Sequence, residues 1–345
     1  MSIKYEVLEH KRDGHSFVQI TGYEGRVEKL IIPETIDGLK VEAIGNHAFS
    51  GRDDISQVVL PESIKTLYGF AFHNCRNLKK ISLFDSLDDY YDGVCRQCDS
   101  LSEVEITVKK SWYEVIRNFL ADNDKTLRFL IHVIDGADKE DIGALDECGK
   151  LRPGKASHEY ETSCLTFPEY VYDFNENTMA RTIQFSIAGS GYAFRECVDR
   201  RKIDYRQYDS LFEKALVDGS EIAQDIAVGR LIYPLELEDK YRLIYEGYIR
   251  ANAGALLKRL IQMYADGVEN ERCEMIIKKL LEYRTDSAKD MLSEVNGEDK
   301  KLLSADVIDE AIRLSTDLST SLLTALLMDL GGKESSAQAL TFTFA

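Results

Sequence analysis

Long apolar runs are missing from this sequence. Charged residues interrupt residues 1–10, so this stretch lacks the apolar centre of a signal peptide. No other window approaches the run of about 18 apolar residues that a membrane-spanning helix requires. We therefore expect no membrane partner and a cytoplasmic protein, or a surface or secreted one if a leader has been removed.

Positive charge is also scarce. The chain has 43 Lys and Arg against 60 Asp and Glu, which gives a formal net charge of −17. Nucleic-acid binding needs clustered Lys and Arg, so we expect no nucleic-acid partner. The acidic residues are spread along both halves, as is typical of a solvated surface. The seven cysteines are scattered and odd in number, which predicts reduced thiols in a reducing compartment.

Established catalytic and cofactor motifs are absent as well. The sequence contains no phosphate-binding G-x-x-x-x-G-K-[ST], no zinc-binding H-E-x-x-H, no G-x-S-x-G and no calcium loop. Gly189-Ser-Gly191 follows a strand-like run, but Phe194 stands where a dinucleotide-binding loop needs its third glycine, so a turn is predicted. We therefore expect no catalytic residue, no metal, no cofactor and no enzymatic activity.

A 23-residue repeat occupies the first third of the chain. Segments of the pattern L-x-x-L-x-L begin at Ile55, Leu78 and Leu101. Two further columns recur in the same register: Ile44, Leu67 and Tyr90, and Ala48-Phe49, Ala71-Phe72 and Val94-Cys95. An earlier unit begins at Val27, 28 residues before Ile55, and its extra residues fit a loop insertion.

This pattern predicts a solenoid with capped ends. The apolar positions of each segment point inward from a strand, and one coil cannot bury them without a neighbour. Val18 and Ile20 are predicted as edge-strand residues of the cap that covers the first coil. Ser111 is predicted to begin a helix that closes the far end, with Trp112 as its plug.

The repeat resembles the BspA-like leucine-rich repeats of bacteria. The resemblance rests on Ile32-Pro-Glu-Thr-Ile-Asp-Gly-Leu-Lys-Val-Glu-Ala-Ile-Gly-Asn-His-Ala-Phe, on Leu60-Pro-Glu-Ser-Ile and on Ala71-Phe-His-Asn-Cys-Arg-Asn-Leu. It covers residues from about 27 to 106. Many proteins with such repeats are secreted or surface-attached binding proteins, so the resemblance implies recognition of another macromolecule.

The remainder of the chain changes period. Residues 129–134 and 182–187 are predicted strands, and the Gly-, Asp- and Glu-rich residues 135–161 between them are a predicted loop. From Tyr208 onward the apolar residues follow a helical period, and residues 304–330 resemble the paired helices of ankyrin-type repeats. The residues predicted to form apolar helix faces include Leu256, Leu257, Leu260, Ile261, Ile276, Ile277, Leu280, Leu281, Leu322 and Leu323.

These observations predict an α+β multidomain fold: a short leucine-rich-repeat solenoid, a small mixed α/β region and an all-α helical array. The predicted boundaries are 1–110 for the solenoid with its cap and 111–200 for a capping helix with the connecting region. The helical domain is predicted at 201–332 and a flexible tail at 333–345.

Some residues have both a chemical and a structural interpretation. Cys95 and Cys98 form a C-x-x-C that could be redox-active or half of a zinc site, but both fall in inward-facing columns of the repeat and are interpreted as core. Cys164, Cys197 and His158 could form a nucleophile site of an unidentified enzyme, between the connecting region and the helical domain.

Three tyrosines share one face of a predicted helix with Ile244 and Ile249. They are Tyr241, Tyr245 and Tyr248. Their spacing could give an aromatic surface stripe, but the isoleucines favour a helix interface or core.

The favoured hypothesis is a non-catalytic protein-protein interaction or scaffold module, and a structural spacer is a further hypothesis. Side chains alternate across a strand, so the outward positions should form two exposed columns. One column is Ile31, Val59, Ser82 and Glu105, and the other is Lys29, Gln57, Lys80 and Glu103. This surface would be apolar at its first coils and acidic at its last, which suits orientation of a protein partner.

Overall fold

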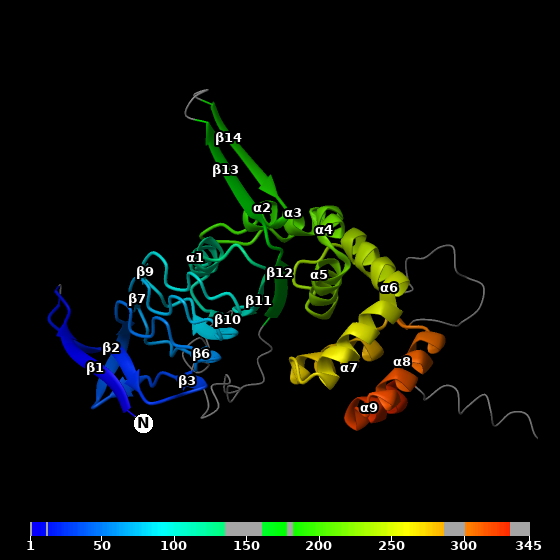
Figure 1. Ribbon diagram of the computed structural model, residues 1–345, viewed down its shortest axis with the longest axis horizontal. Coiled ribbons are helices and arrows are strands. Elements are labelled where there is room, and N and C mark those ends of the chain that lie inside the picture. Colours follow the sequence, from blue (N-terminus) through cyan, green and yellow to red (C-terminus); the bar gives the residue numbers. More distant parts are fainter. Residues whose placement is uncertain (1, 12, 135–160, 178–181, 286–300, 332–345) are drawn as a thin grey trace, which may run out of the picture. The chain divides into compact units, whose positions relative to one another are not determined.

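The computed structural model describes residues 2–11, 13–134, 161–177, 182–285 and 301–331 (Figure 1). The chain divides into two compact units, Met1–Gly219 and Ser220–Ala345. The predicted tail, His158 and nearly all of the predicted loop 135–161 lie outside the described residues.

The first unit contains two sheets to which successive coils contribute one strand each. The first sheet consists of β1 (Ser2–Glu9), β2 (Ser16–Glu24), β5 (Leu39–Ile44), β7 (Thr66–Leu67) and β9 (Asp89–Tyr90), with β4 (Thr35–Ile36) paired to β5. The second consists of β3 (Lys29–Ile31), β6 (Gln57–Val59), β8 (Lys80–Phe84), β10 (Glu103–Val108), β11 (Leu127–Val133) and β12 (Glu161–Phe167).

The strand register confirms the 23-residue repeat. In the second sheet, β3, β6, β8 and β10 are parallel neighbours, and the centres of their L-x-x-L-x-L segments are paired in register. These centres are Leu30, Val58, Ile81 and Val104, each at most 1% exposed. In the first sheet, Ile44, Leu67 and Tyr90 are paired as the repeat predicts.

Aromatic rings and thiols continue the columns inside the solenoid. Phe49 and Phe72 stack with their ring centroids 5.3 Å apart and their planes 4° from parallel. The Cys75 thiol donates to the Phe49 carbonyl oxygen at 3.1 Å, and the Cys98 thiol donates to the Phe72 carbonyl oxygen at 3.0 Å. Both sulfurs therefore occupy one buried column, as the repeat predicts. Contact with Cys98, together with burial, raises the pKa of Cys75.

The ends of the solenoid differ in detail from the prediction. Val18 and Ile20 are fully buried, but β2 is not an edge strand, because β1 covers its outer side as an antiparallel neighbour. The closing helix is α1 (Glu114–Asp122). Ser111 does not cap this helix, since its φ is 55° and the N-cap residue is Tyr113.

Phe119 and Asp122 close the last coil in place of the predicted Trp112, which is only partly buried. Phe119 meets the ring of Tyr90 edge-on with centroids 5.3 Å apart. The Asp122 carboxylate accepts from the Tyr90 hydroxyl at 2.8 Å and from the backbone N–H groups of Gly93 and Cys95 at 3.2 and 3.1 Å. Helix α1 thus satisfies polar groups of the last coil that have no next coil to contact.

The second sheet crosses the boundary predicted at residue 110. Strand β11 pairs in parallel with β10, and β12 then pairs with β11 in antiparallel fashion. An uncovered β10 would expose a row of backbone donors and acceptors, so an added strand completes the sheet. The strand predicted at 129–134 is confirmed over residues 129–133, which belong to β11. The division between the two units falls after Gly219.

The first unit ends in a hairpin and short helices, namely β13 (Val171–Asn177), β14 (Thr182–Ala188), α2 (Gly191–Arg195), α3 (Tyr205–Ser210) and α4 (Phe212–Asp218). The predicted strand at 182–187 is β14. The Tyr208 hydroxyl anchors α3 to β12, since it donates to the Thr166 carbonyl oxygen at 2.7 Å and accepts from the Thr166 N–H at 2.9 Å.

The second unit consists of helices in its described part. They are α5 (Ser220–Ile232), α6 (Asp239–Ala265), α7 (Asn270–Glu282), α8 (Ala305–Asp317) and α9 (Ser321–Gly331). The predicted apolar faces of α6 and α7 are buried over Leu256, Leu257, Leu260, Ile261, Ile276, Ile277, Leu280 and Leu281. None of the described helices combines the length and apolar character needed to cross a membrane.

Two predicted core positions of the helices are exposed. Ile244 is 49% exposed and Leu322 is 69% exposed, whereas their neighbours Tyr245 and Leu323 are fully buried. Adjacent residues lie about 100° apart around a helix, so a narrow contact buries one and leaves the other outside. Tyr241 and Tyr248 are partly buried, consistent with their interpretation as interface residues.

We expect Phe72→Ala to lower the free energy of unfolding of the first unit by about 3–5 kcal/mol, because a large aromatic side chain leaves a cavity in a packed core. Urea denaturation followed by circular dichroism measures the change. Lys79→Ala, at an exposed position at the start of the next coil, is the control and should change it by less than about 0.5 kcal/mol. A loss below about 1 kcal/mol for Phe72→Ala would contradict this packing.

Candidate functional site

The candidate surface is the outward face of the second sheet. Strand pairing aligns Lys29, Gln57, Lys80 and Glu103 in one column and Ile31, Val59, Ser82 and Glu105 in the other. Both rows therefore exist as predicted from the alternation of side chains. The columns are aligned because each coil repeats the same backbone path one strand spacing further on.

Exposure along these columns departs from the prediction. Lys29, Ile31 and Gln57 are exposed, as expected for an open sheet. Val59 is only 3% exposed and Ser82 only 8%. The expectation that both residues are accessible is therefore wrong. The alternation of side chains along a strand determines the face to which a side chain points, but it does not determine which neighbouring groups cover that side chain. Val59 is paired with Ile31 on one side and with Ser82 on the other. Ser82 contacts the longer side chain of Glu105.

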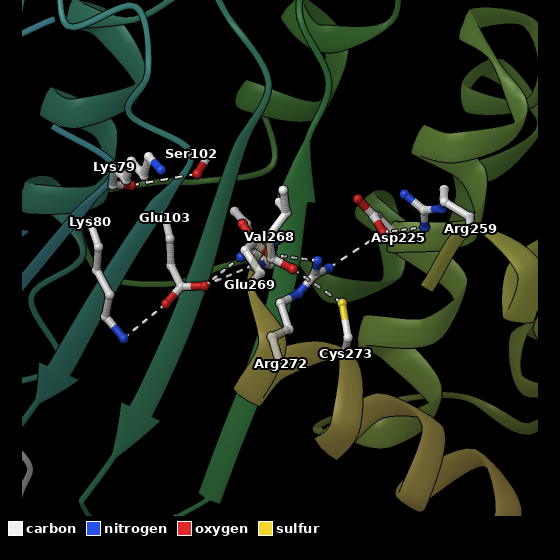
Figure 2. Close-up of polar contacts among 11 residues, drawn as sticks. Lys79, Lys80, Ser102, Glu103, Asp225, Arg259, Val268, Glu269, Arg272 and Cys273 are labelled. Carbon is white, nitrogen blue, oxygen red and sulfur yellow. Dashed lines mark hydrogen bonds and ion pairs between the residues drawn. The ribbon is translucent and has the colours of Figure 1, made fainter. Parts of the chain in front are cut away.

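The last coils of the surface are joined by an ionic network. Lys80 Nζ lies 2.9 Å from Glu103 Oε1 and 2.7 Å from Glu105 Oε2. Figure 2 shows the Lys80 and Glu103 side chains lying across adjacent strands, with a dashed line between their charged groups. The Ser82 hydroxyl donates to Glu105 Oε2 at 3.1 Å, which explains its low exposure.

Two residues of β11 complete this network. Arg128 donates to Glu103 Oε2 from Nε at 3.0 Å and from Nη2 at 2.6 Å. His132 Nε2 lies 3.2 Å from Glu105 Oε1, and its Nδ1 lies 3.1 Å from the Thr162 hydroxyl of β12. Each glutamate thus lies between cationic or hydrogen-bonding groups from two other strands.

The network keeps its carboxylates ionised. Burial by itself would raise the pKa of Glu105, but the hydrogen bond with His132 and the charge of Lys80 outweigh it and lower this pKa to about 2. Burial likewise opposes ionisation of Glu103, yet Arg128 and Lys80 lower its pKa. The pKa of Lys80 is raised, because its two glutamates outweigh its own desolvation.

This electrostatic arrangement favours structure over catalysis. A general acid or base works best with a pKa near the operating pH, and the lowered pKa values of both glutamates lie far below neutrality. The charges are also matched within the network, two acidic side chains against Lys80 and Arg128. The network therefore fixes the last coils, and the accessible part of the surface is at the first coils.

Sequence reasoning missed Arg128, His132 and Thr162. The signal was present, because Phe129 and Ile131 follow Val104 and Ile106 by 25 residues and are buried in the same way. Extension of the repeat by one more unit would have placed Arg128 beside Glu103. Thr162 has no such signal, since β12 joins the sheet in the antiparallel direction.

The predicted nucleophile candidates do not form an accessible site among the described residues. Cys164 is 8% exposed and Cys197 is 2% exposed. Burial raises the pKa of Cys197 to about 12, which disfavours the reactive thiolate. Gly189 and Ser190 form a bend at the predicted turn, and Gly191 begins α2. A Cβ at Gly191 would lie 2.0 Å from the Pro168 carbonyl oxygen, and the Ser190 hydroxyl contacts Asp218.

The second unit has its own polar cluster and cavity. Figure 2 shows Arg259 and Arg272 directed toward Asp225, with Nη2–Oδ1 distances of 2.7 and 3.4 Å, respectively. These contacts connect α6 and α7 to α5. A cavity of about 120 Å³ between α6 and α8 is lined by Gly254, Leu257, Lys258, Val307, Glu310, Ala311 and Leu314. Its lining combines apolar residues with the charged residues Lys258 and Glu310.

Parallel strands in register, a recurring L-x-x-L-x-L pattern and stacked coils define a leucine-rich-repeat solenoid. Residues 23–123 match the family model described as "BspA type Leucine rich repeat region (6 copies)". This stretch is a BspA-type leucine-rich-repeat region. No curated protein matches the chain.

The chain is similar to several solved bacterial structures. One is a leucine-rich repeat protein from Bacteroides ovatus, with 14% identity, 32% of this chain and 49% of that chain covered, and a TM-score of 0.19. A leucine-rich cell surface protein from Faecalibacterium prausnitzii has 15% identity, 32% and 44% coverage, and a TM-score of 0.22. A Treponema pallidum leucine-rich repeat protein has 20% identity, 34% and 76% coverage, and a TM-score of 0.22. The chain thus spans about half the length of the first two.

We expect Glu105 to stabilise the first unit at neutral pH and to lose this effect in acid. Its pKa falls from the ordinary 4.5 to about 2 on folding, so the contribution is complete above about pH 5.5 and disappears as the pH falls toward 2. The free energy of unfolding of the wild type should exceed that of Glu105→Gln by about 2 kcal/mol at pH 7 and approach it near pH 2. Urea denaturation at each pH tests this. A difference independent of pH would exclude the ionised network.

Proposed function

We propose that this chain is a non-catalytic protein-protein interaction or scaffold module that binds its partner through the first coils of the second sheet. The observation that carries the proposal is the change in exposure along that sheet. Lys29, Ile31 and Gln57 are accessible, whereas the charged groups of the later coils contact one another. Leucine-rich-repeat solenoids commonly present such a surface to protein partners.

The composition of the accessible part indicates the partner's chemistry. Ile31 is 38% exposed and gives an apolar contact at the end of its column. Lys29 lies on the same strand with a positive charge, and Gln57 offers an amide beside it on β6. A protein segment with an apolar side chain next to an acidic one would complement this arrangement. The candidate residues of the later coils, Lys80, Ser82, Glu103 and Glu105, then stabilise the sheet through their contacts with one another.

An enzymatic function has less support. The cysteine-histidine nucleophile site considered from the sequence needs an accessible thiol, and Cys164 and Cys197 are buried in the described structure. In our proposal the second unit is an all-α helical array that carries the module. A cytoplasmic location also remains part of the proposal. It is supported by the buried cysteines of the described residues, which form no disulfide with one another: Cys75, Cys95, Cys98, Cys164, Cys197 and Cys273.

The test is capture of a partner by the intact chain from an extract of native cells, followed by measurement with the purified partner. We expect Lys29→Glu combined with Ile31→Glu to abolish binding, because the apolar contact and the positive charge are both reversed. The melting temperature should change little, since both side chains are exposed. Val59 is unsuitable for this purpose, because a charge at a buried position would destabilise the sheet.

The matched control makes equivalent changes on α6 of the second unit. Leu243 is 57% exposed and Arg250 is exposed, so Leu243→Glu combined with Arg250→Glu should leave binding intact. Loss of binding in this variant alone would assign recognition to the helices. Failure of the intact chain to capture any protein would favour a structural spacer.

A further inference from the structure

Three potential metal ligands converge at the turn between β1 and β2. His10 Nδ1 lies 3.3 Å from Asp13 Oδ1, and His15 Nδ1 lies 2.8 Å from the same oxygen. One ligand atom from each residue falls within a group whose members all lie within 4.8 Å of one another. Side-chain exposures of 43%, 62% and 43% for His10, Asp13 and His15 leave the group open to ions from solvent.

The hairpin backbone holds these side chains together. The N–H of His10 donates to the carbonyl oxygen of His15 at 2.9 Å, and the N–H of Gly14 donates to the carbonyl oxygen of His10 at 2.8 Å. The two histidines therefore face each other across the end of the hairpin, with their rings stacked 5.1 Å apart. Asp13 Oδ1 also accepts from the backbone N–H of His15 at 3.3 Å, which turns the carboxylate toward both rings.

A fourth residue orients one of the imidazoles. His15 Nε2 lies 3.1 Å from Glu42 Oε2, and Glu42 belongs to β5, which pairs with β2. A carboxylate that accepts from Nε2–H leaves the lone pair on Nδ1, the atom that faces Asp13. Metal-binding histidines in proteins are typically held in this way by an outer carboxylate. An ion-pair function alone would not require the second histidine to point at the same oxygen.

From this geometry we propose that His10 Nδ1, Asp13 Oδ1 and His15 Nδ1 bind one divalent transition-metal ion, with Glu42 as the outer carboxylate. Bonds of about 2.0–2.2 Å to a tetrahedral zinc ion place neighbouring ligand atoms about 3.3 Å apart. The distances from Asp13 Oδ1 to the Nδ1 atoms of His10 and His15, 3.3 and 2.8 Å, are near this value. Imidazole nitrogens favour zinc, nickel or copper over magnesium and calcium. The protein supplies three ligands, so water or a group from a partner completes the coordination. This site extends beyond the proposed protein-binding surface and lies outside residues 23–123, except for Glu42.

No metal was expected, because the sequence lacks the established metal-binding motifs, and the His-x-x-Asp-x-His spacing of residues 10–15 is not one of them. The backbone hydrogen bonds of the β1–β2 turn bring these three side chains together, as the period of a helix or strand does in the established motifs.

The experiment is calorimetric titration of the untagged, chelator-treated full-length chain with zinc chloride, repeated with cobalt chloride to observe its ligand-field absorption. We expect one zinc ion per chain at this site. His15→Gln and, as an independent variant, Asp13→Asn should each weaken zinc binding at least about tenfold. Glu42→Gln should weaken it by about 10–100-fold, the range for loss of an outer carboxylate. Magnesium or calcium in excess should not compete.

The matched control is His47→Gln combined with His73→Gln, which removes two other histidines of the solenoid and should leave zinc affinity unchanged. Circular dichroism and the melting temperature check that every variant is folded. The proposal is overturned if zinc does not bind the wild type, which would make the group an ion-pair contact only. It is also overturned if His10→Gln combined with His15→Gln binds zinc as tightly as the wild type.

Discussion

Contact between successive coils is the interaction on which the first unit depends. Each coil contributes inward residues such as Val58 and Ile81 that become buried only when the next coil lies against them. The same translation places Phe49 on Phe72 and the Cys75 thiol on a carbonyl of the preceding coil. Apolar burial and hydrogen bonding therefore follow one register, so a displacement of one coil would disturb both.

A stack of coils must end, and the two ends are completed by different means. At the first coil, β1 and β2 add strands to the first sheet. At the last, β11 and β12 extend the second sheet, and Asp122 of α1 accepts hydrogen bonds from the final turn. The Asp85 carboxylate likewise accepts hydrogen bonds just after β10, from the backbone N–H groups of Lys109 and Lys110 at 2.9 and 2.6 Å. At both places a carboxylate accepts from backbone donors that no neighbouring strand pairs.

The proposed protein-binding surface and the proposed metal site both depend on how the coils are stacked and ended. On the second sheet, later coils satisfy their charges among themselves, and recognition is left to the first coils. At the β1–β2 turn, polar side chains converge at the exposed end of a hairpin, where solvent reaches them. Both features belong to the N-terminal end of the solenoid. In our two proposals that end combines a metal ion with a protein contact, whereas the opposite end is closed by α1.

The sequence by itself determined the repeat, the inward columns and the rows on the outward face. These features depend on a period of 23 residues and on the alternation of side chains, both of which are local. The interpretation of Cys98 as a core residue was correct for the same reason. The helical faces of the second unit were also predicted, apart from Ile244 and Leu322 at their borders.

Only the tertiary structure decided what covers each position and which charges meet. Val59 and Ser82 point outward as predicted, yet they are buried by groups that the alternation of one strand does not specify. Arg128 reaches Glu103 because β11 joins the sheet after a helix, and Glu42 reaches His15 because β5 lies beside β2. Such contacts join residues 25 and 27 positions apart. Periodicity specifies the direction of a side chain, whereas its partners depend on how separate strands are brought together.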